Sequence, residues 1–94
     1  MYFDIVSAKY IENYKIELLF ENGKKGIVDL IEYTGKNDVF APFDNIDFFK
    51  NYKVEYGTLT WGDGELDIAP ETLYEKATGT KIADLKESLV KAGQ

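Results

Sequence analysis

Residues 58–74, which read Thr-Leu-Thr-Trp-Gly-Asp-Gly-Glu-Leu-Asp-Ile-Ala-Pro-Glu-Thr-Leu-Tyr, constrain the fold more than any other stretch of the chain. Leu59 and Trp61 share one side of a first extended segment, and the apolar residues of 66–68 do the same in the next, because side chains alternate along a strand. Between them, Gly62-Asp63-Gly64 supplies the positive φ angles that tight hairpin loops require. This stretch therefore predicts a β-hairpin.

A helix is predicted immediately after the hairpin. Pro70 suits the first helical position because its φ is fixed and it has no N–H to lose there. Leu73 and Tyr74 begin an apolar stripe, and Gly79 ends the helix. Asp67 lies three residues before the proline, so we expect it to cap the first turn rather than to act in catalysis.

A second hairpin is predicted over residues 14–30. Tyr14, Ile16, Leu18 and Phe20 alternate with Lys15, Glu17, Leu19 and Glu21, a period typical of a half-buried strand. Asn22-Gly23 follows as a turn. A two-residue loop would place Ile16 opposite Asp29, whereas a three-residue loop ending in a left-handed Gly23 places Ile16 opposite Val28 and Tyr14 opposite Leu30. The apolar pairing favours the three-residue loop, followed by a strand over 25–30.

The remaining segments are shorter and more irregular. Residues 2–8 predict a strand that is apolar on both faces and so suits a central position. Residues 39–43 contain Pro42, which cannot donate to a sheet, and predict an extended connection or an edge. We expect Asp44 to cap a short helix that continues to about Asn51.

The C-terminal half completes the prediction. Residues 52–61 predict one strand with Gly57 as a possible bulge, and a last helix is predicted over 80–92, capped by Thr80. The whole chain, residues 1–94, is then a single α+β domain: a small antiparallel sheet of about five strands, one short helix after the third strand, and one or two helices at the C-terminus.

Composition excludes several function classes. The chain has 94 residues, a formal net charge of −6, no cysteine and no histidine. The charge argues against direct binding of nucleic acid or of an anionic membrane surface, since both require clustered Lys and Arg. Without Cys or His, a serine triad and the common kinds of zinc site are excluded. No apolar run approaches about 20 residues, so we expect a cytoplasmic protein without a membrane span.

Two motifs in order carry a family resemblance. Gly57-Thr58-Leu59-Thr60-Trp61, followed by Asp67-Ile68-Ala69-Pro70-Glu71-Thr72-Leu73-Tyr74, resembles the small bacterial family called domain of unknown function 2442, over roughly residues 1–77. The structural signature within these motifs and the loop between them comprises Trp61, Gly64, Asp67, Pro70, Leu73 and Tyr74.

The resemblance implies an α+β fold and no particular reaction. Members are sometimes fused to a helix-turn-helix domain and sometimes encoded beside another short protein, which implies a regulatory or toxin–antitoxin setting. Only about fifteen residues follow Gly79 in this chain, too few for a DNA-binding domain.

Two kinds of candidate site remain. Asp63, Glu65 and Asp67 recur at every second residue, and three carboxylates on one face of a strand could hold Mg²⁺ or Ca²⁺ or serve a small metal-dependent hydrolase. Solvated hairpin surface explains them more simply, and we assign no catalytic, cofactor or metal residue.

The second candidate site is aromatic. We expect some of four phenylalanines to remain exposed as an apolar interaction patch, namely Phe40, Phe43, Phe48 and Phe49. Trp61 is expected in the core rather than at an interface, because its neighbours are apolar. The favoured function is therefore a non-catalytic, acidic module that binds another protein, and the hydrolase is the alternative.

Overall fold

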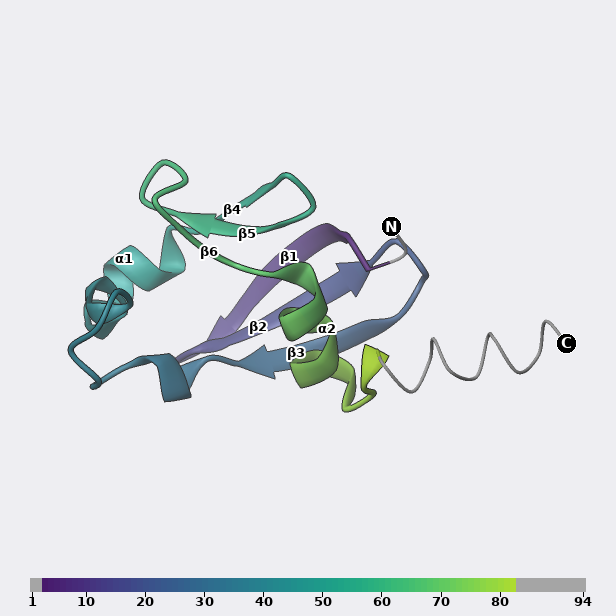
Figure 1. The fold of residues 1–94 in the computed structure, drawn as a ribbon, viewed down its shortest axis with the longest axis horizontal. Helices are drawn as coiled ribbons and strands as arrows, with labels where there is room; N and C mark the ends of the chain where they lie inside the picture. Colours follow the sequence, from purple (N-terminus) through teal and green to yellow (C-terminus); the bar gives the residue numbers. More distant parts are fainter. Residues whose placement is uncertain (1–2, 83–94) are drawn as a thin grey trace, which may run out of the picture.

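The computed structural model describes residues 3–82, which form two three-stranded antiparallel sheets with helices packed against them (Figure 1). The α+β class is confirmed. The small antiparallel sheet predicted with about five strands is divided into two sheets, with the strand orders β1-β2-β3 and β4-β5-β6. The elements are β1 (Ile5–Glu12), β2 (Lys15–Phe20), β3 (Lys25–Asp29), the 3₁₀ helices η1 (Ile31–Tyr33) and η2 (Ala41–Asp44), α1 (Ile46–Lys50), β4 (Lys53–Glu55), β5 (Thr58–Trp61), β6 (Leu66–Ile68) and α2 (Pro70–Thr78).

The β2–β3 hairpin has the predicted register. Ile16 pairs with Val28, and the Leu30 N–H donates to the Tyr14 carbonyl at 2.9 Å. Gly23 adopts a φ of 87°, as the three-residue loop requires. The Asn22 side-chain amide of the same loop donates to the Tyr74 hydroxyl at 3.1 Å, which ties the loop to α2.

Strand β1 lies at an edge of its sheet, so the prediction of a central strand over 2–8 is wrong. Strand β2 occupies the centre and buries Ile16, Leu18 and Phe20 in the core, whereas the edge strand β1 leaves Val6 exposed. At its start β1 meets the second sheet, where the Ile5 N–H donates to the Gly57 carbonyl at 2.8 Å.

A turn at Tyr56-Gly57 divides the single strand predicted over 52–61. Both residues have positive φ, 54° and 77°, which is the signature of a type I′ two-residue hairpin. Strands β4 and β5 therefore pair with each other, Glu55 opposite Thr58, and Gly57 is a turn residue rather than a bulge. The β5–β6 hairpin is confirmed, with Trp61 opposite Leu66.

The segment before α1 differs from its prediction in two ways. Residues 41–44 form η2 instead of an extended connection, since proline suits the start of a 3₁₀ helix as well as it suits an edge strand. The side chain that caps α1 is Asn45, which accepts from the Asp47 N–H at 3.0 Å. Asp44 instead accepts from the Gly35 N–H at 2.9 Å.

Helix α2 begins at Pro70 and ends at a left-handed Gly79, both as predicted. The capping role of Asp67 is wrong. Ala69 is the N-cap residue and no side chain caps the first turn, while Asp67 lies on β6 opposite Thr60. Of the predicted C-terminal helix over 80–92, residues 83–92 lie outside the described part of the chain.

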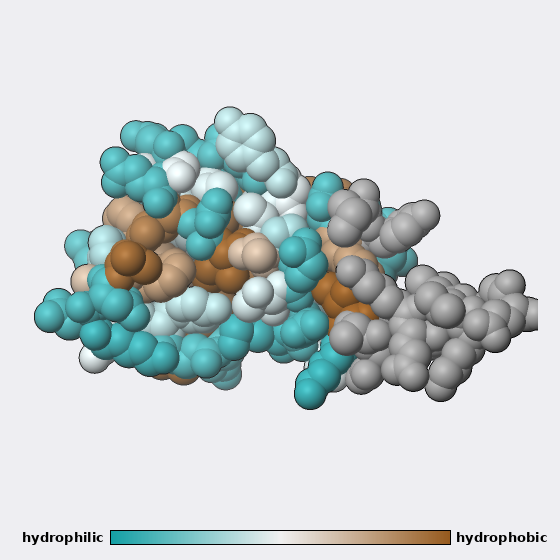
Figure 2. Space-filling model, in the orientation of Figure 1, coloured by the Kyte–Doolittle hydropathy of each residue, from teal (hydrophilic) through white to brown (hydrophobic). Residues whose placement is uncertain are grey.

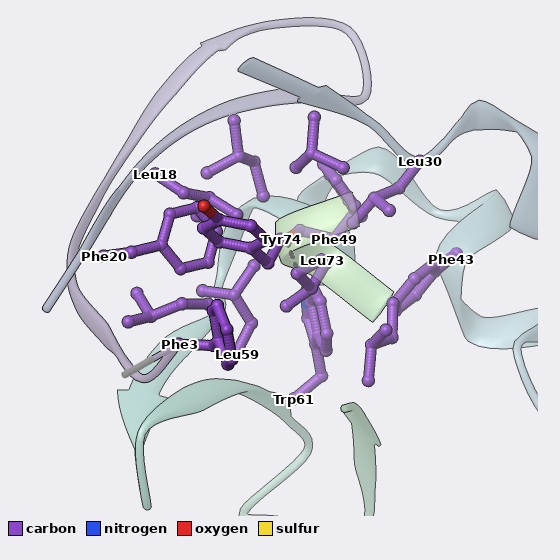
Figure 3. Packing of buried hydrophobic residues seen from close by; sticks show 14 of the residues in the cluster. Phe3, Leu18, Phe20, Leu30, Phe43, Phe49, Leu59, Trp61, Leu73 and Tyr74 are labelled. Carbon is purple, nitrogen blue, oxygen red and sulfur yellow. Dashed lines mark hydrogen bonds between the residues drawn. The ribbon is translucent and has the colours of Figure 1, made fainter. Parts of the chain in front are cut away.

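The core lies between the two sheets, α2 and the η2–α1 segment (Figure 3). It is filled by large apolar side chains that the structure buries almost completely: Ile16, Leu18, Phe20, Val28, Leu30, Phe43, Phe49, Leu59, Trp61, Leu73 and Tyr74.

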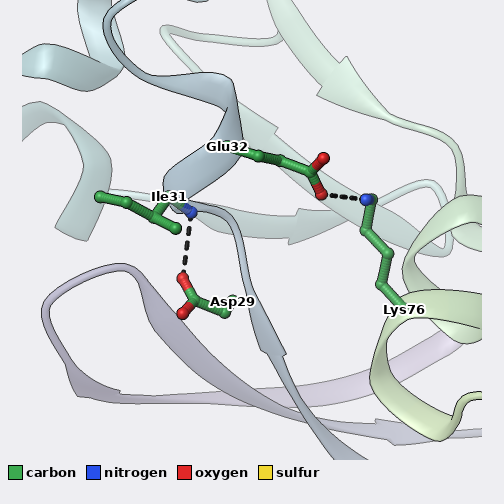
Figure 4. Close-up of polar contacts among 4 residues, drawn as sticks. All are labelled: Asp29, Ile31, Glu32 and Lys76. Atoms are coloured by element: carbon green, nitrogen blue, oxygen red, sulfur yellow. Dashed lines mark hydrogen bonds and ion pairs between the residues drawn. The ribbon is translucent and has the colours of Figure 1, made fainter.

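At the surface, Glu32 of η1 forms an ion pair with Lys76 of α2, and Asp29 accepts from the Ile31 N–H (Figure 4). Among the helices in residues 3–82, none has the length and apolar character to span a membrane.

Candidate functional site

The four phenylalanines proposed as an interaction patch divide into two pairs. Phe43 and Phe49 are completely buried, so neither can contact a partner, whereas Phe40 and Phe48 are half-buried. Phe43 lies beneath the other two, with its ring centroid 5.2 Å from that of Phe40 and 6.4 Å from that of Phe48. The inner pair therefore supports the outer pair from within the core.

Two aliphatic residues extend the exposed part of this cluster. Val39 is 71% exposed and Ile46 is 36% exposed. Together with Phe40 and Phe48 they form what we call the 39–48 surface. Figure 2 shows hydrophobic surface gathered at the end of the molecule where η2 and α1 lie in Figure 1. Exposed apolar side chains gathered in one region are typical of surfaces that bind other proteins.

Sequence reasoning missed Val39 and Ile46. The available signal was their place beside polar residues, Asp38 before the valine and Asn45 before the isoleucine. Those polar neighbours organise the backbone: Asp38 accepts from the Phe40 N–H at 2.9 Å, and Asn45 caps α1. Val39 and Ile46 lie within these two hydrogen-bonded turns, and both are exposed.

Three exposed aspartates form an acidic rim along part of the 39–48 surface, while Lys53 shares a pocket with Phe48 at another part. Asp38, Asp44 and Asp47 are all exposed, and no lysine or arginine occurs between residues 38 and 49. Tyr14 lies beneath this rim and donates from its hydroxyl to the Phe43 carbonyl at 2.7 Å. Burial raises the pKa of Tyr14 and the charge of Asp44 raises it further, so its hydroxyl keeps its proton and the hydrogen bond persists.

Trp61 lies in the core, as expected. Its indole N–H donates to the Phe49 carbonyl at 2.8 Å, and its ring centroid is 4.6 Å from that of Phe43. The tryptophan is therefore the inner support of the aromatic cluster rather than a contact residue. Leu73 and Tyr74, which are also buried, play the same architectural part on α2.

The hairpin carboxylates are not gathered into a site. Asp63 is at the turn and pairs with Lys53 at 3.6 Å, while Asp67 lies on β6. Within residues 3–82 no group of three acidic side chains could hold a metal ion. Gly64, with a φ of 90°, serves the turn between Asp63 and Glu65.

A small pocket lies beside this turn. Its volume is about 150 Å³ and it is lined by Phe48, Asn51, Lys53, Thr60, Trp61, Gly62 and Asp63. Sites for drug-sized ligands typically measure roughly 300 to 1,000 Å³, so this pocket is too small for a sugar ring with its neighbours. The 39–48 surface is therefore the stronger candidate.

Comparison with family models, made on the sequence, returns a match over residues 5–79 to the family described as Protein of unknown function (DUF2442). Comparisons with curated proteins and with solved structures return no match. The matched region runs from the first residue of β1 to the glycine that ends α2, which is most of the chain. The resemblance found in the motifs around Trp61 and Pro70 is thereby confirmed, and the chain belongs to the DUF2442 family.

Proposed function

We propose that this protein is a non-catalytic module that binds another protein through the 39–48 surface. The observation that carries the proposal is the exposure of Val39. This side chain is 71% exposed to solvent, and its neighbour Phe40 is half-buried. Leaving these groups in water forgoes burial worth roughly 25 cal/mol per Å² of apolar area. A partner that covers the surface would recover that free energy.

The partner should be basic. Asp38, Asp44 and Asp47 lie within or next to the segment that forms the 39–48 surface, and the whole chain carries a net charge of −6. Opposite charge on the partner would steer association and would exclude acidic competitors. The proposed partner surface is thus an apolar groove with Lys or Arg at its rim.

The setting we propose is a regulatory or toxin–antitoxin-like pair in the bacterial cytoplasm. In the proposed pair this acidic chain covers a basic partner, since complementary charge favours their association. The absence of histidine and cysteine in the sequence supports a binding role over a catalytic one.

The test is recovery of the partner from the native cell with three forms of the tagged chain. They are the wild type, the double variant Val39→Ser/Ile46→Ser, and the control Ile27→Ser. Ile27 is also an exposed aliphatic residue, but it lies on β3, away from η2 and α1. Substitution of exposed side chains changes stability little, so all three forms should fold.

We expect wild type and Ile27→Ser to retain the same basic protein and the double variant to lose it. Retention should weaken at high salt because the rim charges would be screened. Equal retention by all three forms, or a wild-type chain that stays alone and monomeric, would contradict the proposal.

A further inference from the structure

Tyr56 occupies the tip of the β4–β5 hairpin with its side chain almost entirely in solvent. It is 93% exposed, and no described residue forms a hydrogen bond or ring contact with it. The fold therefore gains nothing from the tyrosine ring through contacts within residues 3–82.

The backbone of Tyr56 is also strained. Its φ is 54°, in the left-handed region that bulky side chains rarely adopt. The first position of a type I′ turn favours Asn, Asp or Gly, which reach positive φ at lower cost. A tyrosine here lowers stability, and strain of this kind at an exposed position points to a role outside the fold.

The tip is held in place from the neighbouring sheet. Gly57 accepts from the Ile5 N–H at 2.8 Å. The Asp4 carboxyl group packs directly on Gly57, where a β-carbon would lie 2.6 Å from the Asp4 Cγ. The ring is therefore presented on a fixed backbone, and little conformational freedom would be lost when it is bound.

The surroundings of Tyr56 indicate the kind of partner. Val6 follows Ile5 of β1, whose N–H donates to the Gly57 carbonyl in the turn, and Val54 lies on β4; both valines are exposed. The Asp4 carboxylate lies against Gly57 at the tip, and the Glu55 carboxylate, one residue before Tyr56, accepts from the Thr60 hydroxyl at 2.7 Å. An aromatic ring with apolar neighbours and an acidic border matches an apolar pocket rimmed by Lys or Arg.

We infer that Tyr56 is an anchor residue that inserts into such a pocket on a basic protein partner. This contact is separate from the 39–48 surface, because the Tyr56 turn lies at the end of β4 and β5 away from α1 (Figure 1). It stands whether or not the 39–48 surface binds a partner.

One substitution at position 56 should change stability and binding in opposite directions. Tyr56→Asn should raise the melting temperature, because asparagine accepts a positive φ more readily, and it should remove binding. Tyr56→Phe should leave the melting temperature unchanged and retain most of the binding, since the ring is kept. If Tyr56 had no binding function, Tyr56→Asn would raise the melting temperature without any loss of binding.

Binding can be measured without knowing the natural partner, by selecting a displayed library of random dodecapeptides on the full wild-type chain. We expect peptides that combine Lys or Arg with apolar residues. Their dissociation constant should rise about tenfold or more for Tyr56→Asn, a loss typical of an anchor residue, and stay unchanged for the control Ile27→Ser.

Three results would overturn the inference: a Tyr56→Asn chain less stable than wild type, selected peptides that bind Tyr56→Asn as well as wild type, or a library that yields no such peptides. Peptides lost only with Val39→Ser/Ile46→Ser would support the 39–48 surface and count against Tyr56. The failures of the two proposals are thus distinguishable.

Discussion

A β-carbon on Gly26 would lie 2.3 Å from the carbonyl oxygen of Ala77, so α2 touches the backbone of β3 with no side chain between them. Real β-carbons do not approach other atoms so closely. The contact sets the distance between α2 and the first sheet, and with it the depth at which Leu73 and Tyr74 enter the core.

Gly26→Ala should therefore destabilise the protein, because the helix backbone must move away from the sheet. We expect a loss of about 1 to 3 kcal/mol in the free energy of unfolding, the usual range for overpacking. Urea denaturation followed by circular dichroism measures it. Ile27→Ala, one residue along the strand but exposed, is the control and should cost less than about 1 kcal/mol. Equal losses for both variants would contradict the contact.

Trp61→Ala should cost about 3 to 5 kcal/mol, since it empties the centre of the aromatic cluster and leaves the Phe49 carbonyl without its donor. A domain of this size has only about 5 to 15 kcal/mol of stability in total, so the variant should be largely unfolded at moderate urea. Trp61→Phe refills part of the volume and should lose less. A fully stable alanine variant would place the indole outside the core.

Asn45 and Asp67 both precede a helix in the sequence, but only Asn45 caps one. Asn45→Ala removes the side chain that accepts from the Asp47 N–H and should cost about 0.5 to 2 kcal/mol. Asp67→Ala removes an exposed side chain that caps nothing and should change stability by less than about 0.5 kcal/mol. Thermal denaturation of the two variants side by side measures the difference. A larger loss of stability for Asp67→Ala than for Asn45→Ala would instead indicate that Asp67 caps a helix.

The ion pair between Glu32 and Lys76 should give stability a defined dependence on pH. The hydrogen bond and charge of Lys76 lower the pKa of Glu32 below its ordinary value of 4.5, and Glu32 raises the pKa of Lys76 above 10.5. A lowered carboxyl pKa stabilises the fold above pH 4.5 and loses that effect as pH falls through the folded pKa. The raised ammonium pKa stabilises it below pH 10.5 and loses that effect as pH rises through the folded pKa.

Glu32→Gln tests this pair. Wild type should have the higher urea midpoint at neutral pH, and the difference should shrink as pH falls below 4.5. Added salt should reduce it as well, because both groups are partly exposed. A difference that stays constant far below pH 4.5 would show that the carboxylate charge is not its source.

Segments with strong local signals were predictable from the sequence. Alternation along β2 and the Asn22-Gly23 turn were enough to choose the register of Ile16 against Val28, because only that register keeps both residues on the core face. Pro70 and Gly79 likewise marked the ends of α2. In these places local preference and tertiary packing agree.

Other features depended on tertiary contacts. Nothing in the sequence marks Tyr56 as a turn residue, and so the second sheet was not anticipated. Phe43 and Phe49 could not be separated from Phe40 and Phe48, since burial of each ring depends on where Trp61 lies. Of the four phenylalanines from which an exposed patch was predicted, two are half-buried and two are buried, and the most exposed residue of the 39–48 surface, Val39, was not among those predicted.

The central proposal is that the 39–48 surface is the contact for a basic protein. The most direct measurement is amide hydrogen exchange of the full chain with and without the protein recovered by the wild type. We expect slower exchange in the complex over residues 38–50, and no change over the exposed side of β3 around Ile27. Protection confined to β3, or none over 38–50, would contradict it.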